Sequence, residues 1–343
     1  GKPLSEGDIS KSNQFISNAY VISPHHSYAR QLARNYLLQI NELFALEEPT
    51  DEDRQKFQAT FEQAVSAAQQ AITDNSQDAQ NWALLASIYA TIIDGDSSEA
   101  VNQALLALEE AKQRAPQNPE YYAIEAQIHF RNDNIEAART AIQNALQLKQ
   151  NYIPAISLLT EIEVSEGNLE NAIATVRALI QLEPNSSGRY YQLAILQINN
   201  EQQDAAIASL EKAVAIDGDF ANARYVLALQ YADKGRTEDA LSNLRHVQNL
   251  NPDVQLITDM IEKLEAGEPI NTDLQSASQV SNEAVPNPET GTVQSDNVED
   301  TDLLSPVNNT QSDNEQTTTS QEPILENIDD SESADEETSQ TTE

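Results

Sequence analysis

The sequence predicts an all-α solenoid built from pairs of antiparallel helices, because three columns of residues recur together every 34 positions. The first column holds a small residue at every step: Ala104, Ala138, Ala172, Ala206 and Ala240. The second holds a large apolar residue: Leu108, Ile142, Val176, Leu210 and Leu244. The third is rich in residues that end helices: Pro116, Gln150, Pro184, Gly218 and Pro252. Chance does not keep three columns in phase over five units, so the chain carries a helical repeat.

The first helix of each unit carries a large side chain, then Leu, a small residue and Tyr, at spacings of three, one and three. The full pattern is Trp82, Leu85, Ala86 and Tyr89, and the later units begin at Tyr122, Ile156, Tyr190 and Arg224. The small positions set the crossing angle, because only a methyl group fits where two helices cross closely. In period and content these units resemble the tetratricopeptide repeat (TPR). The resemblance implies a right-handed α-solenoid of TPR helix pairs that serves as a scaffold for protein–protein interaction.

Two segments precede the regular units. Residues 1–24 are predicted to be a partial leading repeat that consists of a second helix only. We expect an exposed apolar face there, since neighbours cover every helix inside a solenoid, and we expect the chain to begin within a larger protein. Residues 25–76 are predicted to form an expanded helical hairpin, in which Pro49 follows the first helix and Thr50 or Asp51 caps the second.

Residues 77–252 contain the five TPR units, with three departures from the pattern. Glu125, His129 and Arg224 stand where Leu, Tyr and an aromatic residue are usual. Because an unpaired buried charge is costly, we expect these side chains to point outward or to pair, Glu125 with His129 one turn later. The turn of the first unit is longer than the others, around residues 94–98, but it lacks the ligand spacing of a calcium loop.

Two further segments follow the repeats. Residues 253–267 are predicted to form a capping helix, apolar on one face only, as the end of a solenoid requires. Residues 268–343 hold 19 of the 56 acidic residues and no Lys or Arg. Such a segment cannot bury enough apolar surface to offset chain entropy, which predicts a disordered acidic tail. Its apolar islands, Leu303-Leu304 and Pro323–Leu325, fit a solvating tail, with docking motifs as the alternative.

Composition excludes several classes of partner. The net charge of −37 argues against nucleic acid and anionic membrane surfaces. The chain has no Cys, which excludes disulfides and thiolate metal sites and suits an extracytoplasmic setting. No stretch approaches the roughly 18 apolar residues of a membrane span, so we expect no direct membrane insertion by this segment.

Few residues are suited to catalysis. His25 and His26 share a turn, whereas His129 and His246 lie in different repeats. The sequence contains no Gly-rich phosphate loop, metal-ligand pair or nucleophile motif. Carboxylates on solvated helix faces are no evidence for acid–base chemistry. The sequence therefore predicts no active site, no cofactor and no metal site in this chain.

A narrower resemblance rests on the order of the segments. A partial repeat, a long hairpin, an Asn81-Trp82 unit with an extended turn, and regular repeats are similar to the soluble C-terminal region of bacterial O-antigen polymerase or ligase-type membrane proteins. The resemblance implies a soluble region tethered to a membrane in the bacterial cell envelope, with a cytoplasmic location as the alternative. It also implies an alternative function, a docking or regulatory region of a glycan-assembly enzyme, and a plain spacer is a third possibility. The family's transferase chemistry transfers to no residue here.

The predicted binding site lies on the first helices, which line the concave side of a TPR solenoid. Positions five, nine and twelve of each unit form one helix stripe, which becomes apolar and aromatic in the last units. The predicted peptide-binding groove consists of Phe130, Arg131, Tyr191, Ile195, Ile198, Tyr225 and Leu229. We expect it to hold an apolar or mixed peptide or protein segment, with Arg131 as the charge contact. The alternative is that a neighbouring helix or the tail covers these side chains.

A clamp for a C-terminal carboxylate, as in chaperone-binding repeats, is not expected in this groove. Such a clamp uses Lys and Asn side chains on the first helices. The corresponding positions here are small: Ala83, Ser87, Ala123 and Ser157. The sequence leaves the identity of the ligand and the oligomeric state open.

Overall fold

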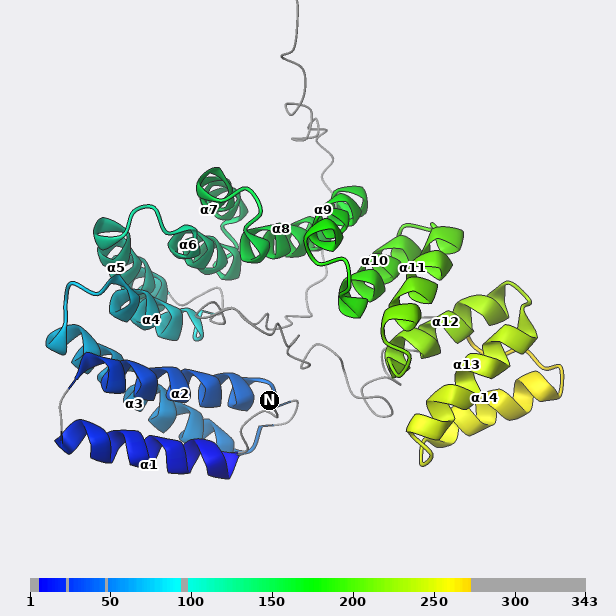
Figure 1. The fold of residues 1–343 in the computed structure, drawn as a ribbon, viewed down its shortest axis with the longest axis horizontal. Helices are drawn as coiled ribbons and strands as arrows, with labels where there is room; N and C mark the ends of the chain where they lie inside the picture. The colour runs from blue at the N-terminus through cyan, green and yellow to red at the C-terminus, as the bar shows by residue number, and fades with distance from the viewer. Residues whose placement is uncertain (1–5, 23–24, 47–48, 94–97, 273–343) are drawn as a thin grey trace, which may run out of the picture. The chain divides into compact units, whose positions relative to one another are not determined.

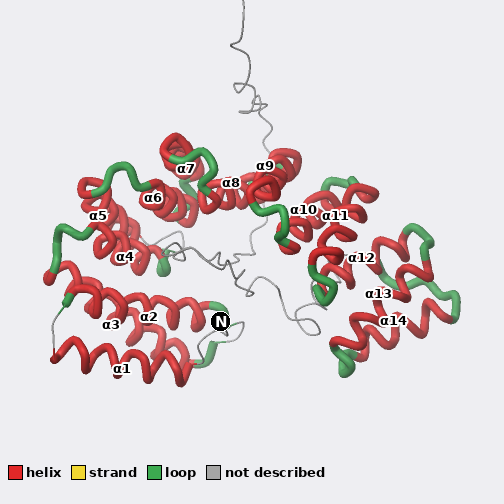
Figure 2. Tube along the Cα trace, viewed as in Figure 1, coloured by secondary structure: helices red, strands yellow, loops and turns green. Residues whose placement is uncertain are grey.

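The computed structural model describes residues 6–22, 25–46, 49–93 and 98–272, and all regular structure within these ranges is α-helical (Figures 1 and 2). The helices are α1 (Glu6–Ile22), α2 (His26–Phe44), α3 (Asp51–Asp74), α4 (Ala79–Ala90), α5 (Ser98–Arg114), α6 (Pro119–Arg131), α7 (Ile135–Leu148), α8 (Ile153–Ser165), α9 (Leu169–Leu182), α10 (Ser187–Asn199), α11 (Gln203–Ile216), α12 (Ala221–Asp233), α13 (Thr237–Leu250) and α14 (Gln255–Glu265). The predictions made for residues 94–97 and 273–343 lie outside the described residues.

The helices pack as consecutive pairs, α2 with α3, α4 with α5, and so on to α12 with α13. Each second helix also contacts the first helix of the next pair, and α14 packs against α13 (Figure 1). This paired, TPR-like packing confirms the predicted all-α fold class.

The 34-residue columns form the centre of the pairs. Every Ala of the first column is 0% exposed, as are four of the five large residues of the second column. Ile142, the fifth, is 1% exposed. The small residue thus marks the close helix crossing, and the large residue beside it fills the space between the helices.

The turn inside a pair also repeats every 34 residues. Asp133, Gly167, Glu201 and Gly235 all have a positive φ, between 53° and 74°. This left-handed conformation suits Gly and strains other residues. A Cβ atom at Gly167 or Gly235 would meet nothing within 4 Å, so the preference for Gly is a backbone effect rather than a packing effect.

Arg224 fits its aromatic position because it makes the same hydrogen bond as the aromatic residues there. Trp82 Nε1 donates to the carbonyl oxygen of Ser76 at 2.9 Å, six residues earlier. Tyr122 Oη donates to the Pro116 carbonyl at 3.3 Å, and Arg224 Nε donates to that of Gly218 at 2.5 Å. In all three units the side chain at this position therefore hydrogen-bonds to the turn that precedes the helix.

The expected pairing of Glu125 with His129 is replaced by a contact across two helices. Glu125 Oε1 lies 2.9 Å from Lys112 Nζ on α5, which satisfies the half-buried carboxylate. His129 is half-buried beside this pair, and burial lowers its pKa. Lys112 on the neighbouring helix places its positive charge against the carboxylate of Glu125, whereas His129 lies one turn along the same helix.

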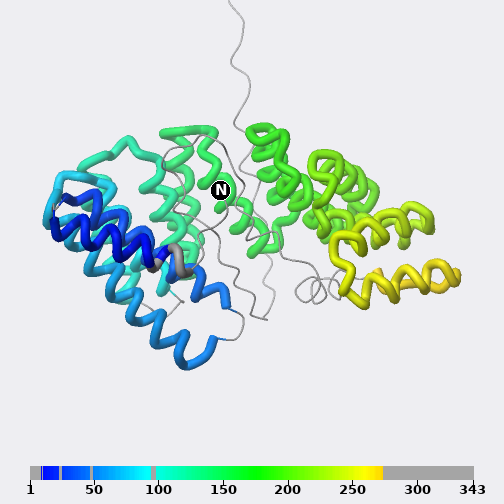
Figure 3. The backbone as a smooth tube through the Cα atoms, turned by 60° about the horizontal axis from the view of Figure 1, so that its bottom comes forward, coloured from blue at the N-terminus to red at the C-terminus, as the bar shows by residue number. Residues whose placement is uncertain are grey.

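At the N-terminal end, α1 lies against α2, and α2 against α3 (Figure 3). Thr50 caps α3 through a capping box with Asp53, so of the two expected caps Thr50 serves. Ile9 of α1 is buried, whereas other large apolar side chains of that helix face solvent, among them Phe15 at 75% and Ile22 at 85% exposure. Part of the apolar surface of α1 is therefore exposed.

The α8/α9 pair has a partly polar interior. Thr160 Oγ1 donates to Thr175 Oγ1 at 2.9 Å, and both side chains are buried. Glu163, 5% exposed, receives hydrogen bonds from Arg139 on α7 at 2.6 Å and from Asn171 on α9 at 3.2 Å. These bonds satisfy polar groups that would otherwise be costly to bury.

Candidate peptide-binding surface

Polar side chains connect the first helices of neighbouring pairs from α4 to α10. Arg131, the last residue of α6, donates from Nη1 to the carbonyl oxygen of Ala90, the last residue of α4, at 2.9 Å. Arg189 of α10 donates from Nη2 to Ser157 Oγ of α8 at 3.2 Å. Because the last carbonyls of a helix have no partner inside it, Arg131 acts as a cap for α4.

The guanidinium of Arg131 is held within the protein. Burial lowers the pKa of Arg131, and the nearby Glu161 carboxylate on α8 opposes that shift. The side chain therefore has both a hydrogen-bond partner at Ala90 and a neighbouring negative charge. As a charge contact for a peptide it stays a prediction, and such a contact would compete with these internal ones.

Three predicted groove residues form a continuous apolar stripe on α10. Tyr191, Ile195 and Ile198 are spaced by four and three, and all three are half-buried. They pack against the buried residues of α10 to α14, which we call the C-terminal core; it includes Leu210, Leu229, Leu244, Ile257 and Leu264. The Tyr191 ring lies 5.2 Å from that of Phe220, which directly precedes α12. We call Tyr191, Ile195 and Ile198 the α10 stripe.

Tyr225 and Leu229 have the same register on α12 but lie inside the C-terminal core. They are 4% and 0% exposed, and burial raises the pKa of Tyr225. This differs from the expectation that both side chains face an open groove. Four stripe positions on α4 and α6 are buried as well: Ala83, Ser87, Ala90 and Ala123. On α8, by contrast, the stripe position Val164 is 43% exposed.

Phe130 belongs to a different part of the interior. It is half-buried and packs against a separate core formed by α6, α7 and α8, which includes Ile142, Tyr152 and Ile162. The structure thus brings together the α10 stripe, Tyr225 and Leu229, and places Phe130 and Arg131 near the end of α6. Of the predicted site, the α10 stripe combines apolar character, a common face and partial exposure.

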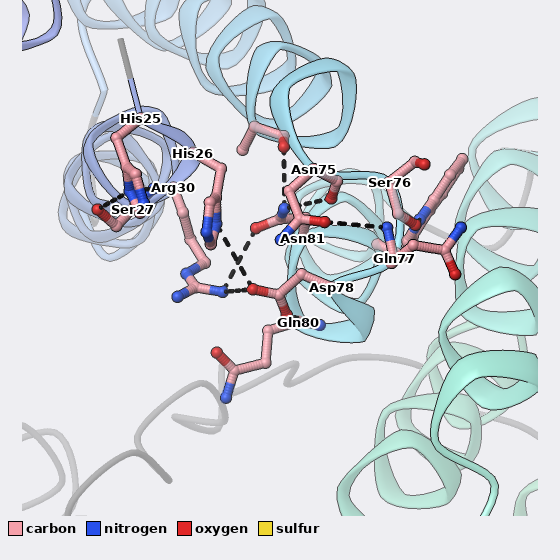
Figure 4. A network of polar contacts seen from close by, with 12 residues as sticks. His25, His26, Ser27, Arg30, Asn75, Ser76, Gln77, Asp78, Gln80 and Asn81 are labelled. Carbon is pink, nitrogen blue, oxygen red and sulfur yellow. Dashed lines mark hydrogen bonds and ion pairs between the residues drawn. The ribbon is translucent and has the colours of Figure 1, made fainter. Parts of the chain in front are cut away.

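A second cluster, which the sequence did not predict, joins α2 to the start of α4 (Figure 4). Asp78 Oδ2 lies 2.5 Å from Arg30 Nη1 and 3.5 Å from His26 Nδ1. The buried Asn81 donates to the carbonyl oxygens of Ala71 and Asn75 at 2.9 and 3.0 Å. The sequence signal for this cluster was Asp78 at the N-cap of α4. Its partners His26 and Arg30 lie about 50 residues earlier in the chain, so the pattern alone did not connect them.

This cluster does not have the geometry of a nucleophilic site. Ser27 Oγ contacts His25 Nδ1 at 2.7 Å, whereas the carboxylate of Asp78 contacts the other histidine, His26. No single histidine therefore connects the hydroxyl to the acid, as a Ser–His–Asp relay requires. The cluster instead joins the hairpin to the first regular pair through the Arg30–Asp78 ion pair and the hydrogen bonds of Asn81.

Metal sites and membrane spans are two further possibilities for the part of the chain that the structure describes. Among those residues, no group of three or more His, Asp or Glu side chains could hold a metal ion. Nor does any described helix have the length and apolar character needed to cross a membrane.

Comparison with known families identifies one repeat. Residues 188–220 match the model of the tetratricopeptide repeat, and these residues include α10 from its second residue onward, with the α10 stripe. No curated protein matches the chain.

Solved structures show broader similarity at low identity. The chain is 18% identical to one in the Cut9–Hcn1 hetero-tetramer of the APC/C, covering 75% of this chain and 46% of that one, with a TM-score of 0.46. It is 14% identical to yeast Tom70, over 80% of this chain and 62% of that one, with a TM-score of 0.47. For YrrB, described as a TPR protein with an unusual peptide-binding site, the identity is 19%, the coverages are 58% and 99%, and the TM-score is 0.43. This chain thus spans about half the length of the Cut9–Hcn1 chain that it matches.

Proposed function

We propose that this protein is a TPR interaction scaffold that binds an apolar or mixed peptide, or a segment of a protein, at the α10 stripe. The observation that carries the proposal is the partial exposure of Tyr191, Ile195 and Ile198 on one helix face, within the matched TPR. Partly exposed aromatic and branched side chains that share a face are typical of binding surfaces. Their inner parts are fixed by the C-terminal core, so the surface is ordered before a ligand arrives.

The neighbouring side chains indicate the chemistry of the ligand. Val164 at the end of α8 is a further exposed apolar side chain, at 43%, and it has the same repeat position as Ile198. Arg189 binds Ser157 of α8 and Glu183, so its charge is already balanced. With a net charge of −37 on the chain, an acidic peptide would be repelled over a long range. A ligand with apolar side chains and neutral or basic flanks therefore fits best.

We also propose a setting for this scaffold, which rests on the sequence resemblance to O-antigen polymerase or ligase-type proteins. In that setting the chain is a soluble region tethered to a membrane in the bacterial envelope, and its ligand is an envelope protein. The alternative function in the same setting is a docking or regulatory region of a glycan-assembly enzyme. Fractionation of source cells with an antibody against the chain tests it: recovery in the envelope fraction supports the setting, and recovery in the cytoplasm overturns it.

Selection from a random peptide display library tests the binding surface. We expect enriched peptides with apolar residues, whose affinity falls about tenfold or more in an Ile195→Lys variant, since a charge would then face the apolar ligand. Leu106→Lys on α5 is the matched control, because Leu106 is 64% exposed and lies outside the stripe. Circular dichroism would establish that both variants fold. Equal binding by the two folded variants would exclude the α10 stripe as the site.

A further inference from the structure

A cleft lies at the N-terminal end, between α1, α2 and α3, and it shares no residue with the α10 stripe. Its volume is about 480 Å³, within the roughly 300–1,000 Å³ of sites that take small ligands or large side chains. Leu32 and Tyr36 of α2 line it together with Ala29, and these three residues share one face of the helix at spacings of three and four. α1 and α3 supply the other lining side chains.

One residue that lines the cleft departs from the repeat pattern. In the repeat register, Leu32 and Tyr36 correspond to Leu85 and Tyr89, so Ala29 corresponds to Trp82. The later units also carry large side chains at this position: Tyr122, Ile156, Tyr190 and Arg224. Ala29 is thus smaller than every side chain at the same register position, and it is 4% exposed at the base of the cleft.

The walls of the cleft are small and polar. α3 contributes Ala59, Ser66 and Glu62, and α1 contributes Tyr20. Tyr20 Oη donates to Asp74 Oδ2 at 2.7 Å, which joins α1 to the end of α3 beside the cleft. Space for a ring, with an apolar floor and polar walls, suits an amphipathic side chain from another segment.

The residues that line the cleft carry negative charge only. Among the described residues that line it, Glu62 carries a negative charge and none is Lys or Arg. Asp74 lies beyond Tyr20 and adds a second carboxylate near one end. A basic residue beside an inserted ring would therefore find a favourable potential, and an acidic one an unfavourable potential.

We propose that this cleft binds an aromatic side chain of a partner protein segment, with a neighbouring Lys or Arg of that segment facing Glu62. The site is separate from the α10 stripe and does not depend on the function proposed for it.

Three short peptides test the proposal by NMR on the isotope-labelled full chain. The probes are acetyl-Lys-Trp-Lys-amide, acetyl-Glu-Trp-Glu-amide and acetyl-Lys-Ala-Lys-amide. The first peptide should shift the methyl signals of Leu32 and the signals of Tyr36, and the other two should bind at least about tenfold more weakly. No shift at Leu32 with the first peptide, or equal shifts with all three, would overturn the proposal.

Variants separate this site from the rest of the chain. Ala59→Lys places a positive charge in the wall, and we expect at least about a tenfold loss of Lys-Trp-Lys binding. Ala178→Lys on α9 is the matched control, because both alanines are exposed on second helices and Ala178 is not among the residues that line the cleft. Equal binding by the two variants would contradict the site. Ile195→Lys should leave this binding unchanged, so loss of one site is distinguishable from loss of the other.

Discussion

Helices α10 and α12 occupy the same place in consecutive repeats, yet their corresponding side chains differ in exposure. Tyr191 and Ile195 on α10 are half-buried, whereas Tyr225 and Leu229, one repeat later, are 4% and 0% exposed. The two pairs have the same register and nearly the same chemistry. Register therefore determines which face of a helix a side chain lies on, and the neighbouring elements determine whether that face is covered.

One stripe residue of α12 lies close to the end of the repeats. Ala232, the third residue of the stripe on α12, lines a small cleft with Leu264 of α14 and with Ile270 beyond it. Ile270 also packs against the C-terminal core that contains Leu229. Tyr225 and Leu229 belong to this core together with Ile257 and Leu264 of α14. At the end of the repeats these stripe positions are therefore part of the core.

The largest effect is expected at the most deeply buried stripe residue. Leu229→Ala removes a side chain that is 0% exposed and should lower the free energy of unfolding by about 4 kcal/mol, as cavity-forming Leu→Ala changes in cores do. Urea denaturation followed by circular dichroism measures it. A loss below about 1 kcal/mol would show that Leu229 is not part of the core.

The second prediction concerns the ion pair between Arg139 of α7 and the buried Glu163 of α8. Arg139→Met leaves Glu163, 5% exposed, without its cationic partner and should destabilise by about 3 kcal/mol. Asn171 still donates to the carboxylate, which keeps the effect below that of a fully orphaned charge. The double variant with Glu163→Met should recover a large part of the loss. Equal stability of Arg139→Met and the parent chain would mean that the ion pair is solvated.

A smaller effect is expected on α10 itself. Ile195→Ala removes a half-buried side chain and should destabilise by about 1.5 kcal/mol, clearly less than Leu229→Ala. The same urea titration measures both variants side by side. Should the two losses be equal, the contrast in exposure between α10 and α12 would be wrong.

The smallest effects concern the turns that follow α10 and α12. Glu201 and Gly235 have positive φ values of 57° and 72°. Gly235→Ala should cost about 1 kcal/mol, and Glu201→Gly should stabilise by about 0.5 kcal/mol, because only Gly adopts this conformation without strain. Opposite signs in thermal denaturation are the expected outcome. Two changes of the same sign would contradict the common turn geometry.

Much of the fold follows from the sequence because helix packing repeats with the chain. The Ala column from Ala104 to Ala240 identifies every close crossing in the five regular pairs. Arg224 shows the limit of this approach, since its long side chain makes a hydrogen bond that the aromatic pattern does not suggest. Glu125 shows another, because its partner Lys112 lies on a different helix and depends on how the pairs stack.

The candidate site was harder to predict than the fold. Position within the repeat selected Tyr191 and Tyr225 equally. The local pattern does not show that Tyr225 is buried in the C-terminal core, whereas Tyr191 lies at its edge. The N-terminal cleft was not predicted from the sequence. Ala29 stands in a column that is otherwise occupied by large side chains, but the cleft depends on how α1, α2 and α3 pack, which the pattern does not give.

The central claim, that α10 presents a surface and α12 a core, is most directly tested by thiol labelling. The chain contains no Cys, so Ile195→Cys and Leu229→Cys each introduce a single reactive group. We predict that a maleimide dye labels position 195 at least about 100-fold faster than position 229, because labelling at 229 requires the core to open. In urea, where both chains are unfolded, the two rates should become equal. Equal rates in the native protein would contradict the claim.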